Sequence, residues 1–183
     1  MLFLEKMDKF VLNPNLPDNT ETVLIGEKYV PALKGPLELL DVELIGVPAN
    51  CRVDPRLSSH ADLSVLHAGG ENFFLAQRLN NTEFADKLIK KGCKICFCAE
   101  NQAEKYPFDA MLNICSIGNA FIYCPKVSDE TVVSYQTGQG RTGISSRQGY
   151  CKCSVCVLDQ KAIISADKGI SRACKSAGLM FWK

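Results

Sequence analysis

The sequence has 183 residues, of which 46% are hydrophobic, and its formal net charge is +1. A chain of this size can bury one core, so we expect a single domain over residues 1–183. The near-neutral charge gives no reason to expect nucleic acid or an anionic membrane as a partner. No apolar run approaches the ~20 residues of a membrane span, and the early charges at Glu5 and Lys6 do not fit a secretory signal. We therefore expect a cytoplasmic protein.

The first elements in chain order are a strand, a helix and a second strand. Residues 23–25 and 42–47 are rich in β-formers, and residues 31–40 form a helix candidate between them. Three segments are expected to be linkers, namely 13–20, 48–59 and 138–149. The last of these is rich in Gly, Arg and Ser, which favours a mobile loop.

Three later segments share one layout, in which two β-rich arms flank a turn signal. The paired arms are residues 63–66 with 73–76, 112–115 with 121–124, and 153–156 with 163–166. A helix is predicted after each pair, over 81–92, over 128–135, and from Asp167 to the residue before Gly178. Closing strands are predicted at 94–98 and 179–182. The chain thus holds about four α/β units of roughly 40 residues, a spacing typical of repeat or propeller architectures.

Strand register predicts which side chains share a face. On a strand, residues i and i+2 point to the same side. If the first arms of the three hairpins extend backwards as strands, their polar residues converge on a common centre. These residues are His60, Asp62, Ser64, Asp109, Asn113, Lys152 and Ser154. The same register places Cys153 on the opposite face, as a buried thiol.

The His60-Ala61-Asp62 motif, followed by an apolar hairpin, resembles the His-x-Asp motif of the guanidino-group-modifying enzymes, or penteins. Residues 60–178 as a whole also resemble a bacterial branch of that superfamily, through segments 152–156 and 165–169. The resemblance implies a five-bladed α/β propeller of ββαβ units around a central channel. We therefore predict a pentein-like α/β propeller with about four of the five units present, as in a chain truncated at its C-terminus.

The resemblance also implies chemistry at a planar cationic carbon. A Cys thiolate attacks the guanidinium carbon, a His moves protons, and carboxylates hold the cation. By motif match His60 takes the His role and Asp62 takes a carboxylate role. The residues predicted to bind substrate are Asp109, Asn113, Ser64 and Lys152, and the candidate nucleophile is Cys153, beside Lys152. In penteins the nucleophilic Cys usually lies in the last blade, and these 183 residues contain no matching segment.

Two functions follow as expectations. The first is a guanidino-group-modifying hydrolase or transferase that acts on a small cationic guanidino or amino compound and needs no cofactor. The second is a non-catalytic protein that binds a small ligand in the channel. An incomplete ring exposes strand edges, so self-association is also expected.

The ten cysteines raise a third hypothesis, a zinc-bound interaction module. Two groups contain the Cys-x-x-Cys spacing, namely Cys93, Cys96, Cys98 and Cys151, Cys153, Cys156. Both groups lie in apolar, strand-like runs rather than in the Gly-bearing turns of a zinc knuckle. We therefore predict reduced, mostly buried thiols and no metal. His67 lies on the apolar face of its hairpin, where a structural role is expected.

Overall fold

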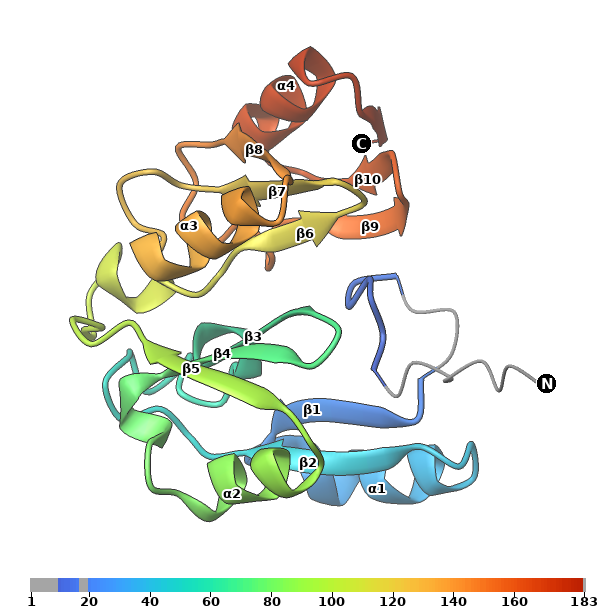
Figure 1. Ribbon diagram of the computed structural model, residues 1–183, viewed down its shortest axis with the longest axis vertical. Helices are drawn as coiled ribbons and strands as arrows, with labels where there is room; N and C mark the ends of the chain where they lie inside the picture. The colour runs from blue at the N-terminus through green and yellow to red at the C-terminus, as the bar shows by residue number, and fades with distance from the viewer. Residues whose placement is uncertain (1–9, 17–19, 183) are drawn as a thin grey trace, which may run out of the picture.

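A computed structural model describes residues 10–16 and 20–182 of the chain. Within these residues the fold is mixed α/β, with four small separate sheets, each accompanied by a helix (Figure 1). In Figure 1 the sheets of the first half of the chain lie below those of the second half. None of the helices in this part of the chain is long and apolar enough to cross a bilayer.

Three of the sheets repeat one ββαβ unit. In each, the first strand is antiparallel to the second, and the second is parallel to the third, which follows a helix. The first of these units consists of β3 (Val65–Gly69), β4 (Asn72–Ala76), α2 (Glu83–Lys90) and β5 (Lys94–Cys98). The second consists of β6 (Cys115–Ile117), β7 (Ala120–Tyr123), α3 (Glu130–Gly138) and β8 (Thr142–Ser145). The third consists of β9 (Cys156–Asp159), β10 (Ala162–Ile164), α4 (Lys168–Ser176) and β11 (Met180–Trp182). These are the three hairpin–helix units that the sequence predicts.

The N-terminal unit has a different set of strands and helices. It contains β1 (Thr22–Gly26), α1 (Val30–Glu38) and β2 (Glu43–Val47), and the two strands pair in parallel. In the described residues this sheet has no antiparallel strand. β1, α1 and β2 are the strand, helix and strand that the sequence predicts here, so the about four predicted units are three ββαβ units and one βαβ unit.

Side-chain caps fix the starts of three helices where the sequence predicts them. The hydroxyl of Thr82 accepts a hydrogen bond from the amide of Ala85, at the start of α2. The carboxylate of Asp167 accepts from the amides of Gly169 and Ile170, at the start of α4. Such caps satisfy amides that the first turn of a helix leaves unpaired. Asp129 caps α3 in the same way.

Some predicted boundaries are wrong. The first strands of the three units begin at Val65, Cys115 and Cys156, two or three residues later than expected. The preceding residues are in short 3₁₀ helices or turns. The segment 138–149 is not one mobile loop, because it contains β8, which pairs with β7 and buries Ile144. A single anchoring apolar residue among Gly, Arg and Ser gives too weak a pattern to mark a strand.

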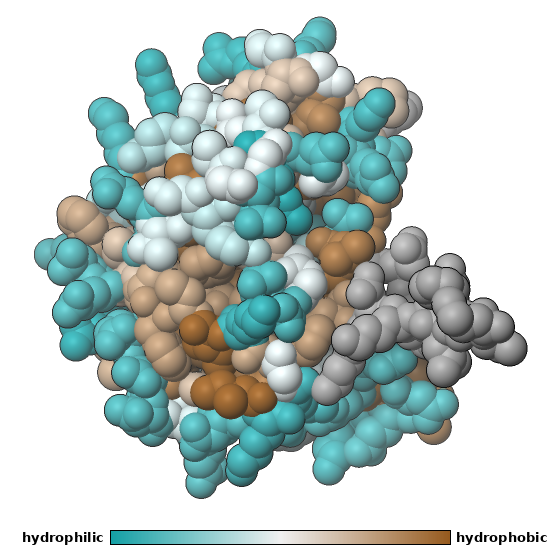
Figure 2. All heavy atoms as spheres, in the orientation of Figure 1, coloured by the Kyte–Doolittle hydropathy of each residue, from teal (hydrophilic) through white to brown (hydrophobic). Residues whose placement is uncertain are grey.

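Three apolar clusters form the core between the sheets and their helices. Each is built mainly from one or two units, and fully buried members include Leu75, Ile122 and Ile163. On the face shown in Figure 2, hydrophilic side chains dominate the periphery, while hydrophobic atoms come to the surface nearer the middle. The core thus holds the units rigid enough to position the segments between them.

Gly26, the last residue of β1, is expected to tolerate no side chain. A Cβ at this position would lie 1.9 Å from the carbonyl oxygen of Ser59. Because the obstacle is backbone, Gly26→Ala should lower the free energy of unfolding by about 1–3 kcal/mol, measured by urea denaturation. Gly35→Ala in α1 is the matched control, since a Cβ there meets nothing within 4 Å. An equal effect of the two substitutions would contradict the expected close contact.

Candidate functional site

The candidate site is built from irregular segments rather than from strands. His60 precedes a short 3₁₀ helix, Ala61–Leu63, that leads into β3 and contains Asp62. Asn113 lies two residues before β6, and Cys153 lies in the turn before β9. Each of the three ββαβ units therefore contributes residues that shortly precede its first strand, and the start of that strand fixes where the segment ends.

Three side chains make direct contact at the centre of the site. The sulfur of Cys153 lies 2.8 Å from Oδ2 of Asp62. The amide nitrogen Nδ2 of Asn113 lies 2.9 Å from the same oxygen and 3.1 Å from the sulfur. His60 completes the cluster, because one atom each of His60, Asp62 and Cys153 lies within 4.8 Å of the others. A nitrogen base, a carboxylate and a thiol thus converge from sequence positions up to 93 residues apart.

Asn113 fixes the turn that carries the thiol. Its Oδ1 accepts hydrogen bonds from the main-chain amides of Lys152, at 2.7 Å, and Cys153, at 3.1 Å. The residue is fully buried. The carbonyl oxygen of this one side chain holds the turn, and its NH₂ group holds the Asp62 carboxylate and the Cys153 sulfur. Both polar groups of the primary amide are therefore hydrogen-bonded.

The Cys153 thiol is electrostatically unusual. Although the residue as a whole is exposed, partial burial of its sulfur, followed by the negative charge of Asp62 and the hydrogen bond to it, raises the pKa of Cys153 to about 12. Asn113 and Lys152 act in the opposite direction, with smaller effects. The thiol is therefore protonated at neutral pH and donates its proton to Asp62.

Ser64 and Asp109 belong to a different, buried network. Nδ2 of Asn50 donates to Oγ of Ser64, at 3.0 Å, and to Oε1 of Gln102, at 2.8 Å. Nε2 of Gln102 donates to the main-chain carbonyl of Asp109, at 2.9 Å. All four residues are at most 4% exposed. Their side chains hold the segments before β3 and β6 together beneath the surface, instead of lying in direct contact with the Cys153 thiol.

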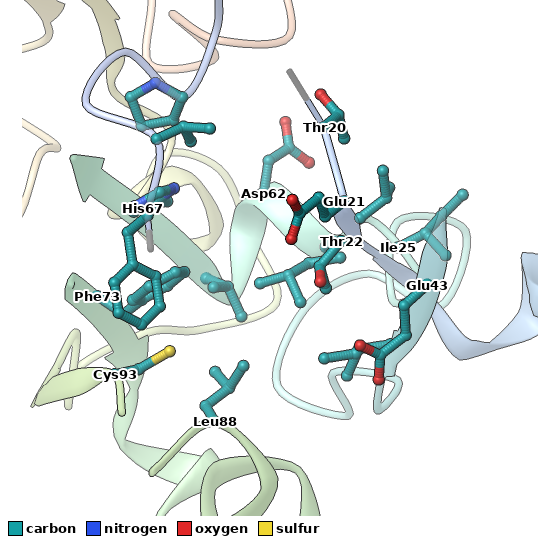
Figure 3. Close-up of a pocket in the computed structure, with 18 of the residues that line it drawn as sticks. Thr20, Glu21, Thr22, Ile25, Glu43, Asp62, His67, Phe73, Leu88 and Cys93 are labelled. Carbon is teal, nitrogen blue, oxygen red and sulfur yellow. The ribbon is translucent and has the colours of Figure 1, made fainter. Parts of the chain in front are cut away.

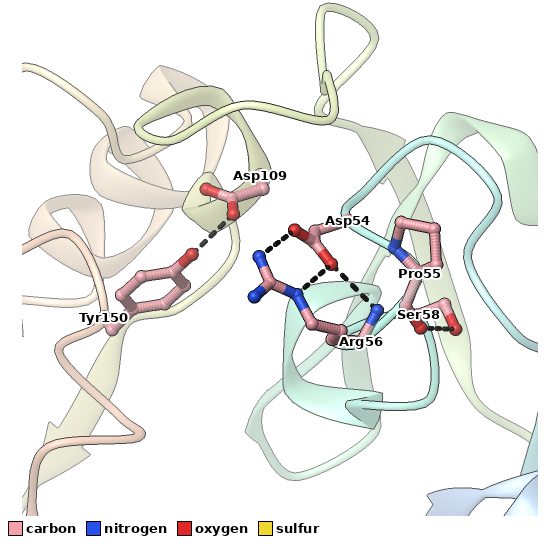
Figure 4. A network of polar contacts seen from close by, with 6 residues as sticks. All are labelled: Asp54, Pro55, Arg56, Ser58, Asp109 and Tyr150. Atoms are coloured by element: carbon pink, nitrogen blue, oxygen red, sulfur yellow. Dashed lines mark hydrogen bonds and ion pairs between the residues drawn. The ribbon is translucent and has the colours of Figure 1, made fainter.

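The carboxylate of Asp109 links this network to the turn of Cys153. Oδ2 accepts a hydrogen bond from the hydroxyl of Tyr150, whereas Oδ1 is buried without a partner among the described residues (Figure 4). Burial and the contact with Asp109 raise the pKa of Tyr150. Nearby in the same view, the Arg56 guanidinium holds the pKa of Asp54 down at about 2. Asp54 is thus paired within its own loop.

A groove of about 1600 Å³ opens beside the cluster. His60, Asp62 and Lys152 line it at the site. Its other walls come from residues 10–14, from β1, from the β3–β4 hairpin and from the end of α2. Figure 3 shows Asp62 facing this space, with His67 and Phe73 on one side and Ile25 on the other. The His67 ring stacks on Phe73 and bonds to the carbonyl of Gly70, which fits the structural role expected for it.

The structure corrects the side-chain direction that strand register predicts for Cys153. The sequence places its side chain on the face opposite Asp62, yet the two are in hydrogen-bond contact. The alternation rule fails because residues 151–154 form a turn, in which side chains do not alternate. The rule also missed Asn50 and Gln102, whose burial nothing in their neighbouring sequence indicates.

The cysteines of the two Cys-x-x-Cys groups differ in environment. Cys93, Cys98 and Cys151 are buried, whereas Cys153 and Cys156 are exposed. Six of the ten cysteines are buried, so the prediction of mostly buried thiols is confirmed, although Cys51, Cys153 and Cys156 are exposed. Within residues 10–16 and 20–182, the group of potential metal ligands that converges is His60, Asp62 and Cys153, rather than either cysteine group. These three side chains are the ones that could hold a metal.

Comparison with solved structures supports the general fold. DDAH from Pseudomonas aeruginosa, a mutant complexed with citrulline, matches 85% of this chain with a TM-score of 0.54 and 13% identity. The match covers 63% of DDAH, so the chain spans less than two thirds of that protein. ArgZ, a cyanobacterial arginine dihydrolase, matches 90% of this chain and 36% of its own, with 14% identity. Its TM-score of 0.35 is too low to support a structural conclusion.

The fold therefore has the general architecture of the pentein proteins, to which DDAH belongs. A family model matches residues 24–183, and the chain belongs to that family, a family of unknown function designated DUF6873. No curated protein sequence matches the chain.

Proposed function

We propose that this protein acts on, or binds, a small cationic guanidino or amino compound at the cluster of His60, Asp62 and Cys153. The observation that carries the proposal is the contact of 2.8 Å between the Cys153 sulfur and the Asp62 carboxylate, with His60 beside them. A carboxylate can hold a guanidinium by paired hydrogen bonds, which places the planar carbon within reach of a neighbouring sulfur.

In the enzymatic form of the proposal, Cys153 is the nucleophile. A cation bound to Asp62 would offset the negative charge that raises the thiol pKa, so substrate binding itself favours the thiolate. The thiolate would attack the guanidinium carbon, and His60 would move the proton to the departing amine. Asn113 would keep the sulfur and the carboxylate in place throughout.

The arrangement of the four α/β units is also part of this proposal. We infer that the three ββαβ units and the βαβ unit are arranged as blades of a pentein-like propeller, within one domain over residues 1–183. The support is the repeated strand order, together with the convergence of the segments that precede three successive first strands. In this arrangement the cluster lies where the blades meet, and the predicted binding residues Ser64, Asp109 and Lys152 support it from the surrounding segments.

A non-catalytic binding protein is the alternative. It is favoured by the raised pKa of Cys153, because a thiol that stays protonated at neutral pH is a poor nucleophile. In this case Asp62 holds the ligand cation, and Cys153 serves only as a hydrogen-bond donor to the carboxylate.

Calorimetry with arginine and agmatine separates these cases. We expect both compounds, or one of them, to bind, and Asp62→Asn to weaken binding at least about tenfold because the charged acceptor is lost. Cys153→Ser should keep binding but abolish thiol-dependent release of ammonia or amine. Cys156→Ser is the matched control, since Cys156 is also exposed and lies outside the cluster.

The outcomes distinguish the hypotheses. If the native protein binds neither compound, or Asp62→Asn binds them equally well, the site is not a guanidino site. Binding without turnover that responds to alkylation of Cys153 would replace the enzyme with the non-catalytic alternative.

A further inference from the structure

In the part of the chain that the structure describes, the N-terminal sheet has a free edge. In the other three sheets, the second strand of the unit has an antiparallel strand on one side and a parallel strand on the other. β1 occupies the place of that second strand, because it precedes the helix and pairs in parallel with β2. Among residues 10–16 and 20–182, no strand lies on its other side.

The direction of the main-chain groups in β1 identifies the free donors and acceptors. The carbonyl of Glu21 accepts from the amide of Glu43, so residue 21 faces β2. Because main-chain groups alternate along a strand, Val23 and Ile25 also face β2, and Thr22 and Leu24 face outward. No hydrogen bond from the described residues reaches the outward main-chain groups of Thr22 and Leu24.

The groove beside the site follows this same edge. Seven consecutive residues, 20–26, line it. A strand that presented one face would contribute alternate residues only, so a continuous run indicates that the edge itself borders the groove. Figure 3 shows Thr22 and Ile25 on this strand, across the groove from His67.

Residues 11–16, in the described part of the segment before Thr20, do not fill the place. In the other units the first strand comes directly before the second, across a tight turn. Here Val11 instead accepts a hydrogen bond from the amide of Gly70, and Asn15 donates to the carbonyl of Ser116, at 2.8 Å. These contacts hold residues 11 and 15 against the sheets of β3–β5 and β6–β8. Residues 11–14 line the same groove as β1, but their main chain is not paired with it.

We propose that the free edge of β1 binds an extended segment of a partner protein as an antiparallel strand. The three complete units show which occupant this edge fits, namely a strand of three to five residues bound through its main chain. The proposal does not rest on the guanidino chemistry, because it involves main-chain hydrogen bonds that need neither Asp62 nor Cys153.

The orientation of the bound strand would connect it to the site. In the first complete unit, the start of β3 pairs with the end of β4. An antiparallel strand on β1 would likewise start at Gly26, which lies against Ser59, the neighbour of His60. Asp62, Asn113 and Cys153 lie two or three residues before the first strands of their own units. A partner side chain at the same offset would therefore lie next to His60.

Amide exchange and a peptide probe test the proposal on the whole chain. In the free protein, the amides of Thr22 and Leu24 should exchange much faster than those of Val23 and Ile25. The probe is a synthetic, fluorescently labelled peptide with the sequence of residues 63–69, which contains the strand that fills this place in the next unit. It should bind, and should slow exchange at Thr22 and Leu24. The same peptide with alternate amides N-methylated should not bind.

A pair of substitutions at Thr22 separates the contribution of its main-chain amide from that of its side chain. Thr22→Pro removes an outward amide at an exposed first strand position, where proline is tolerated, and should weaken peptide binding at least about fivefold. Thr22→Val keeps the amide and should bind as the native chain does. Slow exchange at Thr22 and Leu24 in the free monomer, or no peptide binding, would overturn the proposal. So would dimerisation that Thr22→Pro abolishes, because the occupant would then be a second copy.

Discussion

Replacing Asn113 with Ala is expected to lower the free energy of unfolding by about 3 kcal/mol. The side chain is fully buried and makes four hydrogen bonds, to Asp62, to the Cys153 sulfur and to the amides of Lys152 and Cys153. Each is worth about 0.5–1.5 kcal/mol, and truncation leaves partners unsatisfied. In a chain of this size, such a loss lowers the melting temperature by roughly 6–12 °C.

Two further substitutions test whether the loss of stability comes from the hydrogen bonds of Asn113. Asn80→Ala removes the same side chain from an exposed turn and should change the stability by less than about 0.5 kcal/mol. Asn113→Asp keeps an acceptor for the two amides but places a second carboxylate beside Asp62, so it should also destabilise the protein at neutral pH. If Asn113→Ala were no more destabilising than Asn80→Ala, the hydrogen bonds of Asn113 would not hold the turn.

Replacing Asp62 with Asn is expected to make Cys153 more reactive. Burial contributes most to the raised pKa of Cys153, and the charge of Asp62 contributes next. Removing that charge lowers the thiol pKa while burial still keeps it above its ordinary value. Below its pKa, the thiolate fraction rises tenfold for each unit by which the pKa falls, so a fall of about one unit would accelerate alkylation at pH 8 about tenfold.

The measurement is the rate of iodoacetamide labelling of Cys153, followed by mass spectrometry of the peptide that contains it. Asp159→Asn removes the same charge from an exposed residue that does not contribute to the Cys153 pKa, and should leave the rate unchanged. The sign of the effect is decisive. Slower labelling in Asp62→Asn would mean that Asp62 acts as a base that activates the thiol, rather than as a charge that suppresses the thiolate.

The repeated architecture could be predicted because its signals are local. Turn residues between β-rich arms, and caps such as Thr82 and Asp167, each act within a few positions of the sequence. They recur with the same spacing, so three ββαβ units emerge from pattern alone. The strand β8 was missed because only Ile144 among its four residues is buried.

The site could be predicted only in part, because it depends on where strands begin. Asp62 and Asn113 were predicted to converge, and their side chains are 2.9 Å apart. The sequence predicts that Cys153 points away, because the register counts the turn before β9 as strand, and an alternation rule reverses when its starting point shifts. Asn50 and Gln102 connect segments distant in sequence, and a buried polar pair of this kind leaves no periodic signal.

The cluster of His60, Asp62 and Cys153 comes from two segments that precede strands, and this has a consequence for how the architecture can diversify. His60, Asp62 and Cys153 precede the strands β3 and β9 and take no part in the ladders that hold the sheets together. A substitution at these positions changes the donor atoms at the centre while the strand pairing remains as it is. Sequences with this scaffold can therefore acquire or lose a reactive group by single replacements, and the scaffold alone does not determine which chemistry a given member of the family performs.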